Sequence, residues 1–264
     1  MKKKALNKIS LYRFEQFSKF SSVQHFITCK NNIGNNQFTM SLSSVKEPNP
    51  IIENRKLLAD ALGLTPENFV FHQQEHTKNV TVVKKVHGGK GFYIYDEGFA
   101  DNDAMITNEK NLCLMIMGAD CVPILLYDPI NGIIGAAHAG WRGTVQSIAS
   151  TTVKAMQNKF GCRPSDLVAG IGPSIGPQNY EVDQVVYDKF SKSFDYCHEL
   201  FTNGKKAGKY QLDLWKANKI QLLNAGLRDE NIEVSEICTF ENNEDFFSAR
   251  KGDSGRFASG IMLV

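Results

Sequence analysis

An excess of charge of either sign is missing from this sequence. Its 264 residues contain 30 Lys and Arg against 28 Asp and Glu, which gives a formal net charge of +2. A balance this even gives no support to nucleic-acid binding through bulk electrostatics. The chain also has no run of about 18 apolar residues, and its basic N-terminus is not followed by the apolar segment of a signal peptide. We therefore expect a cytoplasmic protein whose partners include neither nucleic acid nor a membrane.

The cysteines lack the spacing of a structural framework. None of the six forms a Cys-x-x-Cys pair, and they are spread from Cys29 to Cys238. In a chain of this length, such cysteines are typical of reduced thiols. With 42% hydrophobic residues, the chain can bury roughly 70–75% of its unfolded surface without the help of disulfide bonds.

The middle of the chain has the clearest secondary-structure pattern. Continuous apolar runs at 112–117, 122–127 and 133–137 predict three buried strands, and a 3.6-residue period then predicts a helix over 145–160. Weaker patterns predict helices at 52–62, 182–190 and 212–225, and strands at 69–71, 79–83, 167–171, 233–238, 246–249 and 260–264. Strands and helices alternate without a regular βαβ rhythm, which favours an α+β or layered sandwich over a doubly wound sheet.

Cys121 and His138 follow from this pattern as candidate metal ligands. Cys121 lies just after the first buried strand, and His138 lies at the end of the third. Neighbouring antiparallel strands would bring both to one edge of a sheet. A third ligand must come from elsewhere, and His76 and His87 both compete for that place. Two His and one Cys suit zinc, and three protein ligands leave the fourth position to water, as in catalytic zinc sites.

Other polar residues near these strands allow both a functional and a structural interpretation. Asp120 is either a general acid or base beside the cysteine, or a carboxylate that ends a strand. Arg142, at the start of a helix, either grips a phosphate or ribose or forms an internal salt bridge. The glycine-rich turn around Gly172 has the wrong spacing for a dinucleotide fingerprint, so we interpret it as a turn lining the pocket, with Ser174 as a hydrogen-bond donor.

Three motifs carry a resemblance to a known family. Ala119-Asp-Cys-Val-Pro-Ile-Leu-Leu126, Ala137-His-Ala-Gly-Trp-Arg-Gly-Thr144 and Gly172-Pro-Ser-Ile-Gly176 resemble the polyphenol oxidase or laccase-domain family of zinc proteins, which is now associated with purine nucleoside phosphorylase and adenosine deaminase activity. The resemblance runs from about Glu53 to the C-terminus. It implies one domain over residues 1–264, folded as a four-layer α/β/β/α sandwich of mixed sheets.

The resemblance also implies a set of site residues. The zinc ligands would be His76, Cys121 and His138, because the family's first histidine stands in a Gln-x-His segment that Gln74 completes and that His87 lacks. The residues implied for catalysis are Asp120, Cys121, His138 and Arg142, and those implied for substrate binding are Arg142, Gly172, Ser174 and Arg250. This sequence departs from the family pattern at Thr77, where glycine is usual, and at Lys251, where a second arginine is usual.

The expected function is zinc-dependent phosphorolysis of adenosine, inosine and related nucleosides, which releases the base and ribose 1-phosphate. Adenosine deaminase and methylthioadenosine phosphorylase are further expected activities, and nucleoside and phosphate are the expected small-molecule partners of a monomer or homodimer. Three alternatives stay open. One is a Cys121–His138 hydrolase of peptidoglycan precursor editing. The second is a copper-dependent polyphenol oxidase, for which six histidines are few. The third is a non-catalytic metal-binding module.

Overall fold

Two six-stranded sheets form the centre of the computed structural model, which describes residues 1–7, 9–30, 32–33, 36–43 and 45–264. The first sheet has the strand order β1 (Lys2–Leu6), β2 (Ile9–Arg13), β3 (Val23–Thr28), β17 (Phe257–Leu263), β9 (Cys113–Gly118), β6 (Phe69–Val70). The second has the order β16 (Ile232–Val234), β12 (Val168–Ile171), β10 (Val122–Asp128), β11 (Ile133–Ala139), β8 (Ala104–Thr107), β7 (Val80–Val82). Both sheets mix parallel and antiparallel pairs.

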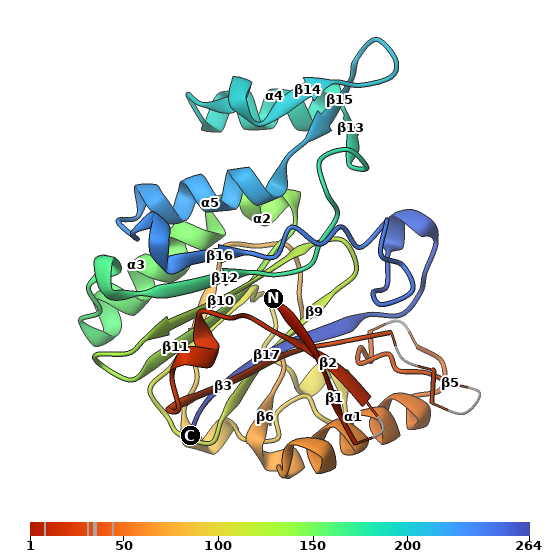
Figure 1. Ribbon diagram of the computed structural model, residues 1–264, viewed down its shortest axis with the longest axis vertical. Coiled ribbons are helices and arrows are strands. Elements are labelled where there is room, and N and C mark those ends of the chain that lie inside the picture. The colour runs from red at the N-terminus through yellow and green to blue at the C-terminus, as the bar shows by residue number, and fades with distance from the viewer. Residues whose placement is uncertain (8, 31, 34–35, 44) are drawn as a thin grey trace.

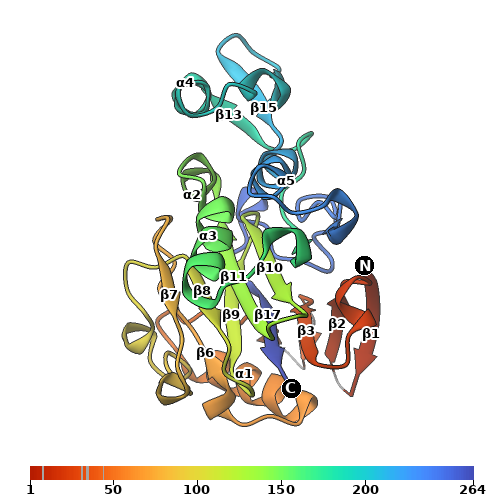
Figure 2. The same cartoon turned by 90° about the vertical axis from the view of Figure 1, so that its left-hand side faces the viewer.

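Helices cover the outer face of each sheet. Helix α1 (Asn49–Leu62) packs on the first sheet, and α3 (Ile148–Phe160) and α5 (Leu214–Asn224) pack on the second. A smaller sheet of β13 (Glu181–Asp183), β15 (Lys209–Leu212) and β14 (Phe201–Asn203) joins α4 (Gln184–Ser193), and together they project from one end (Figures 1 and 2). This arrangement confirms the expected four-layer α+β sandwich of mixed sheets.

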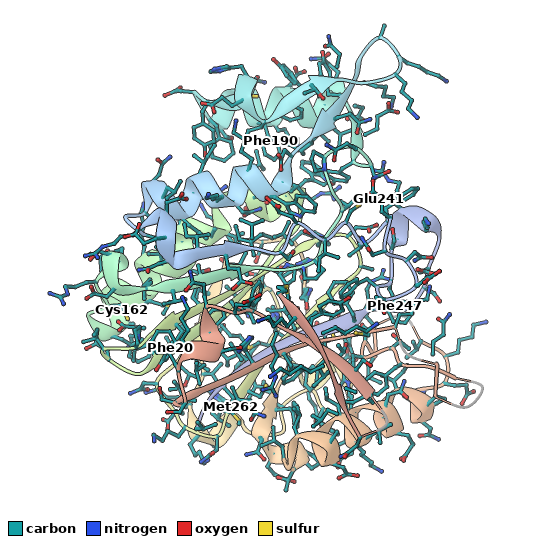
Figure 3. The ribbon with its side chains drawn as sticks, in the orientation of Figure 1. Phe20, Cys162, Phe190, Glu241, Phe247 and Met262 are labelled. Carbon is teal, nitrogen blue, oxygen red and sulfur yellow. The ribbon has the colours of Figure 1, made fainter. Side chains whose placement is uncertain are left out.

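The alternation of side chains along β10 explains how the two sheets are held together. Leu125 and Tyr127 belong to the apolar cluster between the sheets, whereas Ile124 and Leu126 belong to the cluster under α3 and α5. Both faces of this strand are therefore buried, and each such side chain contributes roughly 1.5–3 kcal/mol to stability. In Figure 3, Phe247, Phe190 and Met262 each mark one of the three apolar clusters: between the sheets, on the outer face of the second sheet and under α1.

Three of the expected elements differ from the structure, and the first is the strand expected at 233–238, which is shorter because β16 ends at Val234. The helix expected from residue 145 is two helices, α2 (Trp141–Val145) and α3, because Ser147 has a left-handed backbone with φ of 64° that interrupts the first. The prediction of a strand at 246–249 is wrong, because the segment is a bend and irregular backbone followed by a short 3-10 helix (Ala249–Lys251). Phe246 and Phe247 gave the apolar signal because both rings are buried between the sheets without belonging to either.

None of the helices in the described ranges is both long and apolar enough to cross a membrane.

Candidate metal centre and adjoining cavity

The pairing of β10 with β11 brings the first two candidate ligands together. In this antiparallel pair Val122 stands opposite Ala139 and Pro123 opposite His138. Cys121, one residue before β10, therefore lies beside His138, close to the end of β11. The prediction that these two side chains meet at one edge of a sheet is confirmed. His138 is buried, and Cys121 is half-buried.

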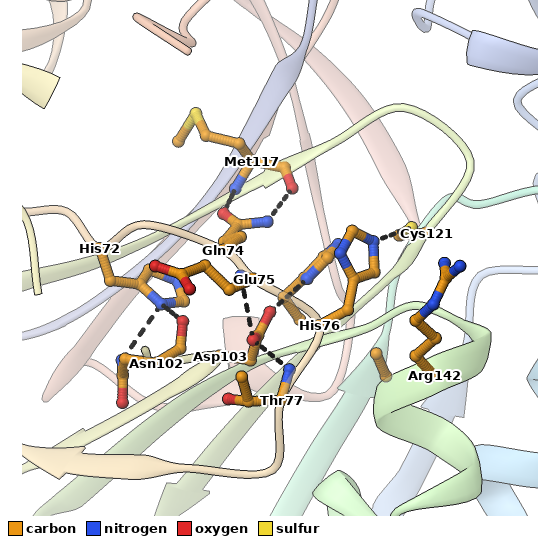
Figure 4. Close-up of polar contacts among 12 residues, drawn as sticks. His72, Gln74, Glu75, His76, Thr77, Asn102, Asp103, Met117, Cys121 and Arg142 are labelled. Atoms are coloured by element: carbon orange, nitrogen blue, oxygen red, sulfur yellow. Dashed lines mark hydrogen bonds and ion pairs between the residues drawn. The ribbon is translucent and has the colours of Figure 1, made fainter. Parts of the chain in front are cut away.

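His76 completes a group of three possible ligands. One ligand atom from each of His76, Cys121 and His138 lies within 4.8 Å of the others. The Cys121 Sγ is 3.9 Å from His76 Nε2, and the two imidazole rings have their centroids 5.0 Å apart (Figure 4). His76 comes from an irregular segment between β6 and β7 and has a left-handed backbone with φ of 62°. The tight turn at this residue places its ring against the edge of the second sheet.

His87 lies outside this group. It stands in a 3-10 helix (Lys85–His87), where its Nδ1 accepts a hydrogen bond from the backbone N–H of Lys84 and its ring packs edge-on against Phe99. Of the two competing histidines, the structure therefore brings His76, and not His87, to Cys121 and His138.

Asp103, which no sequence motif singled out, connects the two histidines of the group. Its Oδ1 is 2.7 Å from His138 Nδ1. Its Oδ2 accepts hydrogen bonds from the backbone N–H groups of Thr77 (2.6 Å) and Glu75 (3.2 Å), the residues on either side of His76. One buried carboxylate thus fixes both ligand-bearing segments (Figure 4). The sequence signal for it is slight: a single acid directly before the short buried strand β8.

Charges and hydrogen bonds in this group favour the thiolate form of Cys121 over the neutral thiol. Burial works to raise the pKa of the Cys121 thiol, but the charges and hydrogen bonds of His138 and His76 lower it to about 6. Burial works to lower the pKa of His138, but the Cys121 thiolate and the Asp103 carboxylate raise it to about 9. Burial opposes the charge on Asp103 as well, and its bond with His138 still holds the pKa of that carboxyl below its usual range.

These residues fit a zinc ion. Zn–N bonds of about 2.0 Å and Zn–S bonds of about 2.3 Å at tetrahedral angles place donor atoms about 3.3–3.5 Å apart, slightly closer than the Cys121–His76 separation in the structure. Because Asp103 occupies Nδ1 of His138, Nε2 of that ring is left for a metal, which is the arrangement of carboxylate–histidine–zinc sites. The donor set of two imidazoles and one thiolate suits zinc as well as copper, so it does not identify the ion.

A cavity of about 280 Å³ adjoins the three ligands. Besides them, it is lined by Ser41, Ser43, His72, Gln74, Tyr95, Met117, Ala119, Ala249 and Arg256. Gln74 is fixed by two hydrogen bonds to the backbone of Met117 (Figure 4). His72 is buried, and its Nδ1 lies 2.9 Å from the carbonyl oxygen and 3.1 Å from the side-chain nitrogen of Asn102. Among the described residues, Nε2 of His72 has no hydrogen-bond partner.

Asp120, Gly172 and Ser174 are not among the residues that line this cavity. The Asp120 carboxylate accepts hydrogen bonds from Thr239 Oγ1 (2.6 Å) and from the backbone N–H of Arg250 (2.7 Å). Gly172 packs so closely on Pro123 that a Cβ there would lie 2.8 Å from its ring. Ser174 is fully buried, and its hydroxyl accepts a hydrogen bond from the Trp215 indole at 2.6 Å. Their roles in substrate binding or catalysis stay predictions.

Arg142 and Arg250 lie near the ligands without lining the cavity. Arg142 is exposed and stacks on Trp141, with its guanidinium carbon 4.5 Å from the ring centroid, and its side chain rises from α2 on the side of the site where Cys121 lies (Figure 4). Arg250 stacks on Tyr180 at 5.2 Å and donates a hydrogen bond to the carbonyl of Glu181. Among the described residues, neither arginine forms a salt bridge, so the internal salt bridge that was the alternative interpretation of Arg142 is not observed there.

Comparison with known proteins assigns the chain to a family. The family described as multi-copper polyphenol oxidoreductase laccase matches residues 26–264. A purine nucleoside phosphorylase of Bacteroides thetaiotaomicron is 36% identical over 256 residues, which cover 95% of each chain. The adenosine deaminase RL5, from an unknown prokaryotic organism, is 32% identical and covers 80% of this chain and 81% of its own. Among solved structures, the hypothetical protein YfiH of Bacillus licheniformis has the same fold, with a TM-score of 0.92, 32% identity and 98% of each chain covered. The chain therefore belongs to the multi-copper polyphenol oxidoreductase laccase family.

Proposed function

We propose that this protein is a zinc-dependent purine nucleoside phosphorylase that acts on adenosine, inosine and related nucleosides, and that the same site deaminates adenosine. The observation that carries the proposal is the group of His76, Cys121 and His138, which offers three ligands and adjoins a cavity. Relatives that match most of this chain are named for these two activities. A zinc ion held by these residues would act as a Lewis acid and leave one coordination position for water or substrate.

The two reactions make different demands on the site. In phosphorolysis a phosphate oxygen bonds to C1′ of the ribose, while the C1′–N9 bond breaks and its electron pair leaves with the purine, which takes up a proton. In deamination a water oxygen bonds to C6 of the purine and ammonia leaves. Both need a held nucleoside and a positioned nucleophile. We assign the metal to His76, Cys121 and His138. In line with the family resemblance, we place Arg142 and Arg250 among the substrate-binding residues, with Arg142 at the phosphate or ribose end of the nucleoside.

The chain's own residues prepare this site before any substrate enters. Asp103 holds His138 in one orientation and one tautomer, so its Nε2 is aimed at the shared ligand position. The same carboxylate fixes the backbone around His76. Preorganised ligands of this kind do not have to be ordered during the reaction.

A cysteine hydrolase is the second candidate function, and one observation favours it. Cys121, His138 and Asp103 form a thiolate, an imidazole and a carboxylate in the order used by nucleophilic cysteine enzymes. Such an enzyme needs no metal. Metal dependence therefore separates the two candidates.

The test is product analysis on the zinc-loaded protein. Adenosine, inosine and 5′-methylthioadenosine are each incubated with inorganic phosphate in ¹⁸O-water, and the products are identified by mass spectrometry. We expect free base with ribose 1-phosphate, and ¹⁸O-labelled inosine from adenosine. Chelation should abolish both reactions, and addition of zinc, but not of copper, should restore them.

Two histidine variants form the matched control. His76→Ala should lose bound zinc and activity, whereas His87→Ala, outside the group, should keep both. Intact nucleosides under all conditions would refute the proposed function. Hydrolysis of a peptide or amide substrate that survives chelation and stops after alkylation of Cys121 would favour the hydrolase.

A further inference from the structure

Arg256 is the one lysine or arginine among the described residues that line the cavity beside the metal ligands. It was not singled out from the sequence, and it is a different residue from Arg142 and Arg250, which do not line this cavity. None of the described lining residues is a carboxylate. Arg256 therefore brings a positive charge to this cavity, and it also lines a second cavity whose lining includes Lys46 and Glu47.

The Arg256 guanidinium is held to the described residues through one of its three nitrogens, Nη1. Its Nη1 donates hydrogen bonds to the backbone carbonyls of Gly255 (2.7 Å) and Ser254 (3.1 Å). A guanidinium has five N–H groups, and only Nη1 donates to the described residues, so within that part of the chain the N–H groups of Nε and Nη2 have no acceptor. The nearby Asp253 carboxylate is taken by Lys30 and Asn243. Arg256 therefore has a fixed position and unused donors.

Ser41 is held next to Arg256 by the backbone. Met40 N–H donates to the Arg256 carbonyl at 2.9 Å, and the Arg256 N–H donates to Thr39 Oγ1 at 2.9 Å. Ser41 follows directly, and its Oγ accepts from the backbone N–H of Ser43 at 3.1 Å, which leaves the hydroxyl hydrogen to donate elsewhere. The guanidinium and this hydroxyl thus present donors from two segments that are locked together.

The position of these residues fits an entry point for a small ion. Ser41, Ser43 and Arg256 line the cavity beside the ligands and also a second cavity of about 570 Å³. They therefore stand where the two spaces meet. An ion that enters through the second cavity reaches Arg256 before it reaches Cys121 and His138.

We propose that Arg256, together with the Ser41 hydroxyl, binds the inorganic phosphate that attacks the nucleoside. Planar guanidinium groups bind phosphate through paired N–H donors, and serine hydroxyls add single donors to the remaining oxygens. Held there, the phosphate lies at the edge of the cavity, with the metal ligands beyond it. This inference deepens the proposed phosphorolysis and rests on it for the identity of the anion.

The test measures phosphate binding and turnover in zinc-loaded protein. Inorganic phosphate is titrated by isothermal calorimetry into the wild type, Arg256→Met, Arg256→Lys, Arg142→Met and the exposed control Arg163→Met. Loss of a charge-assisted pair should weaken phosphate binding about 10- to 100-fold in Arg256→Met, with a smaller effect in Arg256→Lys, whose ammonium keeps the charge without the paired donors. Arg163→Met should bind like the wild type. Zinc content and circular dichroism confirm that each variant is folded.

Turnover supplies an internal control, because deamination uses water and no phosphate. In Arg256→Met the KM for phosphate should rise, while deamination of adenosine keeps its kcat and KM. Unchanged phosphate binding in Arg256→Met, no phosphate binding by the wild type, or loss of binding in Arg142→Met alone would each overturn the inference. Equal loss of both reactions would overturn it too, because Arg256 would then serve the nucleoside. Arg256-dependent phosphate binding without any nucleoside turnover would refute the proposed function and leave the anion site standing.

Discussion

Asp103 Oδ1 and His138 Nδ1 lie 2.7 Å apart, and the backbones of the same two residues are joined by a 2.8 Å hydrogen bond from the His138 N–H to the Asp103 carbonyl. This double connection arises because β8 and β11 pair in antiparallel register, with Ala104 opposite Ala137. The imidazole thus has little freedom to rotate. A ligand fixed in this way binds a metal without a further loss of side-chain entropy.

The first prediction concerns this carboxylate. Asp103→Asn keeps the shape of the side chain but removes its charge and one acceptor, so His138 and the backbone around His76 lose part of their support. We expect zinc affinity to fall about 10- to 100-fold, the range found when outer-shell partners of zinc ligands are removed. Competition with a chromophoric chelator measures the affinity directly, without reference to activity.

Asp101 provides the matched control for that experiment. It lies two residues away, is exposed and has a left-handed φ of 47° that asparagine tolerates well. Asp101→Asn should bind zinc like the wild type. Equal affinities of Asp103→Asn and wild type would show that the 2.7 Å contact does not support the metal site.

The second prediction concerns Gly140, at the N-terminal end of α2. A Cβ on this residue would lie 2.8 Å from His76 Cδ2 and 3.0 Å from Cys121 Sγ, although its backbone angles suit alanine. Gly140→Ala should therefore displace the His76 ring and lower zinc affinity by about tenfold or more while every ligand is still present. The chelator competition measures this effect, and thermal unfolding of the metal-free protein serves as the control. Wild-type affinity would mean that His76 can shift without loss.

The sequence pattern was sufficient to predict that Cys121 and His138 lie close together, because both residues stand at the ends of strands that continuous apolar runs predict clearly. The apolar runs at 122–127 and 133–137 fix β10 and β11, and the antiparallel pairing of these two strands determines which ends meet, whereas the run at 112–117 is β9 of the other sheet. His76 lies in an irregular segment with a left-handed backbone, where periodicity says nothing. Its choice over His87 depended on the family resemblance, and the geometry agrees with that choice.

Other features depend on contacts between distant segments, which local patterns do not encode. Asp103 precedes a strand of four residues, too short to stand out, and its partners come from two other segments. Ser174 has the sequence context of a pocket-lining turn, yet its hydroxyl is bound by Trp215 of α5. The strand β1 has an exposed, lysine-rich pattern, which is typical of an edge strand and gives no apolar signal.

The third prediction separates the two readings of Asp120. Its carboxylate bridges the turn before β10 to Thr239 and Arg250, and Thr239 is fully buried. Asp120→Ala would leave both donors without an acceptor, so we expect the free energy of unfolding to fall by at least about 2 kcal/mol in urea denaturation. Asp120→Gly, which suits the φ of 87° at this position, should be destabilised less. Unfolding like the wild type together with lost turnover would instead support a general acid.

The fourth prediction uses the reactivity of Cys121 in metal-free protein. Because the thiolate is the reactive form, and its pKa is lowered to about 6 chiefly by His138, iodoacetamide should modify this half-buried cysteine rapidly at pH 7.5. Below the pKa the thiol is protonated, so the rate should fall about tenfold between the plateau and pH 5. Burial raises the pKa of Cys29 and Cys162 to about 12, and these buried thiols should react slowly.

Peptide mapping by mass spectrometry follows the modification of each cysteine. Zinc should suppress the fast phase, Cys121→Ser should remove it, and His138→Gln should move its midpoint upward. A rate that still climbs between pH 8 and 9 in the wild type would show that Cys121 titrates as an ordinary thiol and that His138 does not hold its charge.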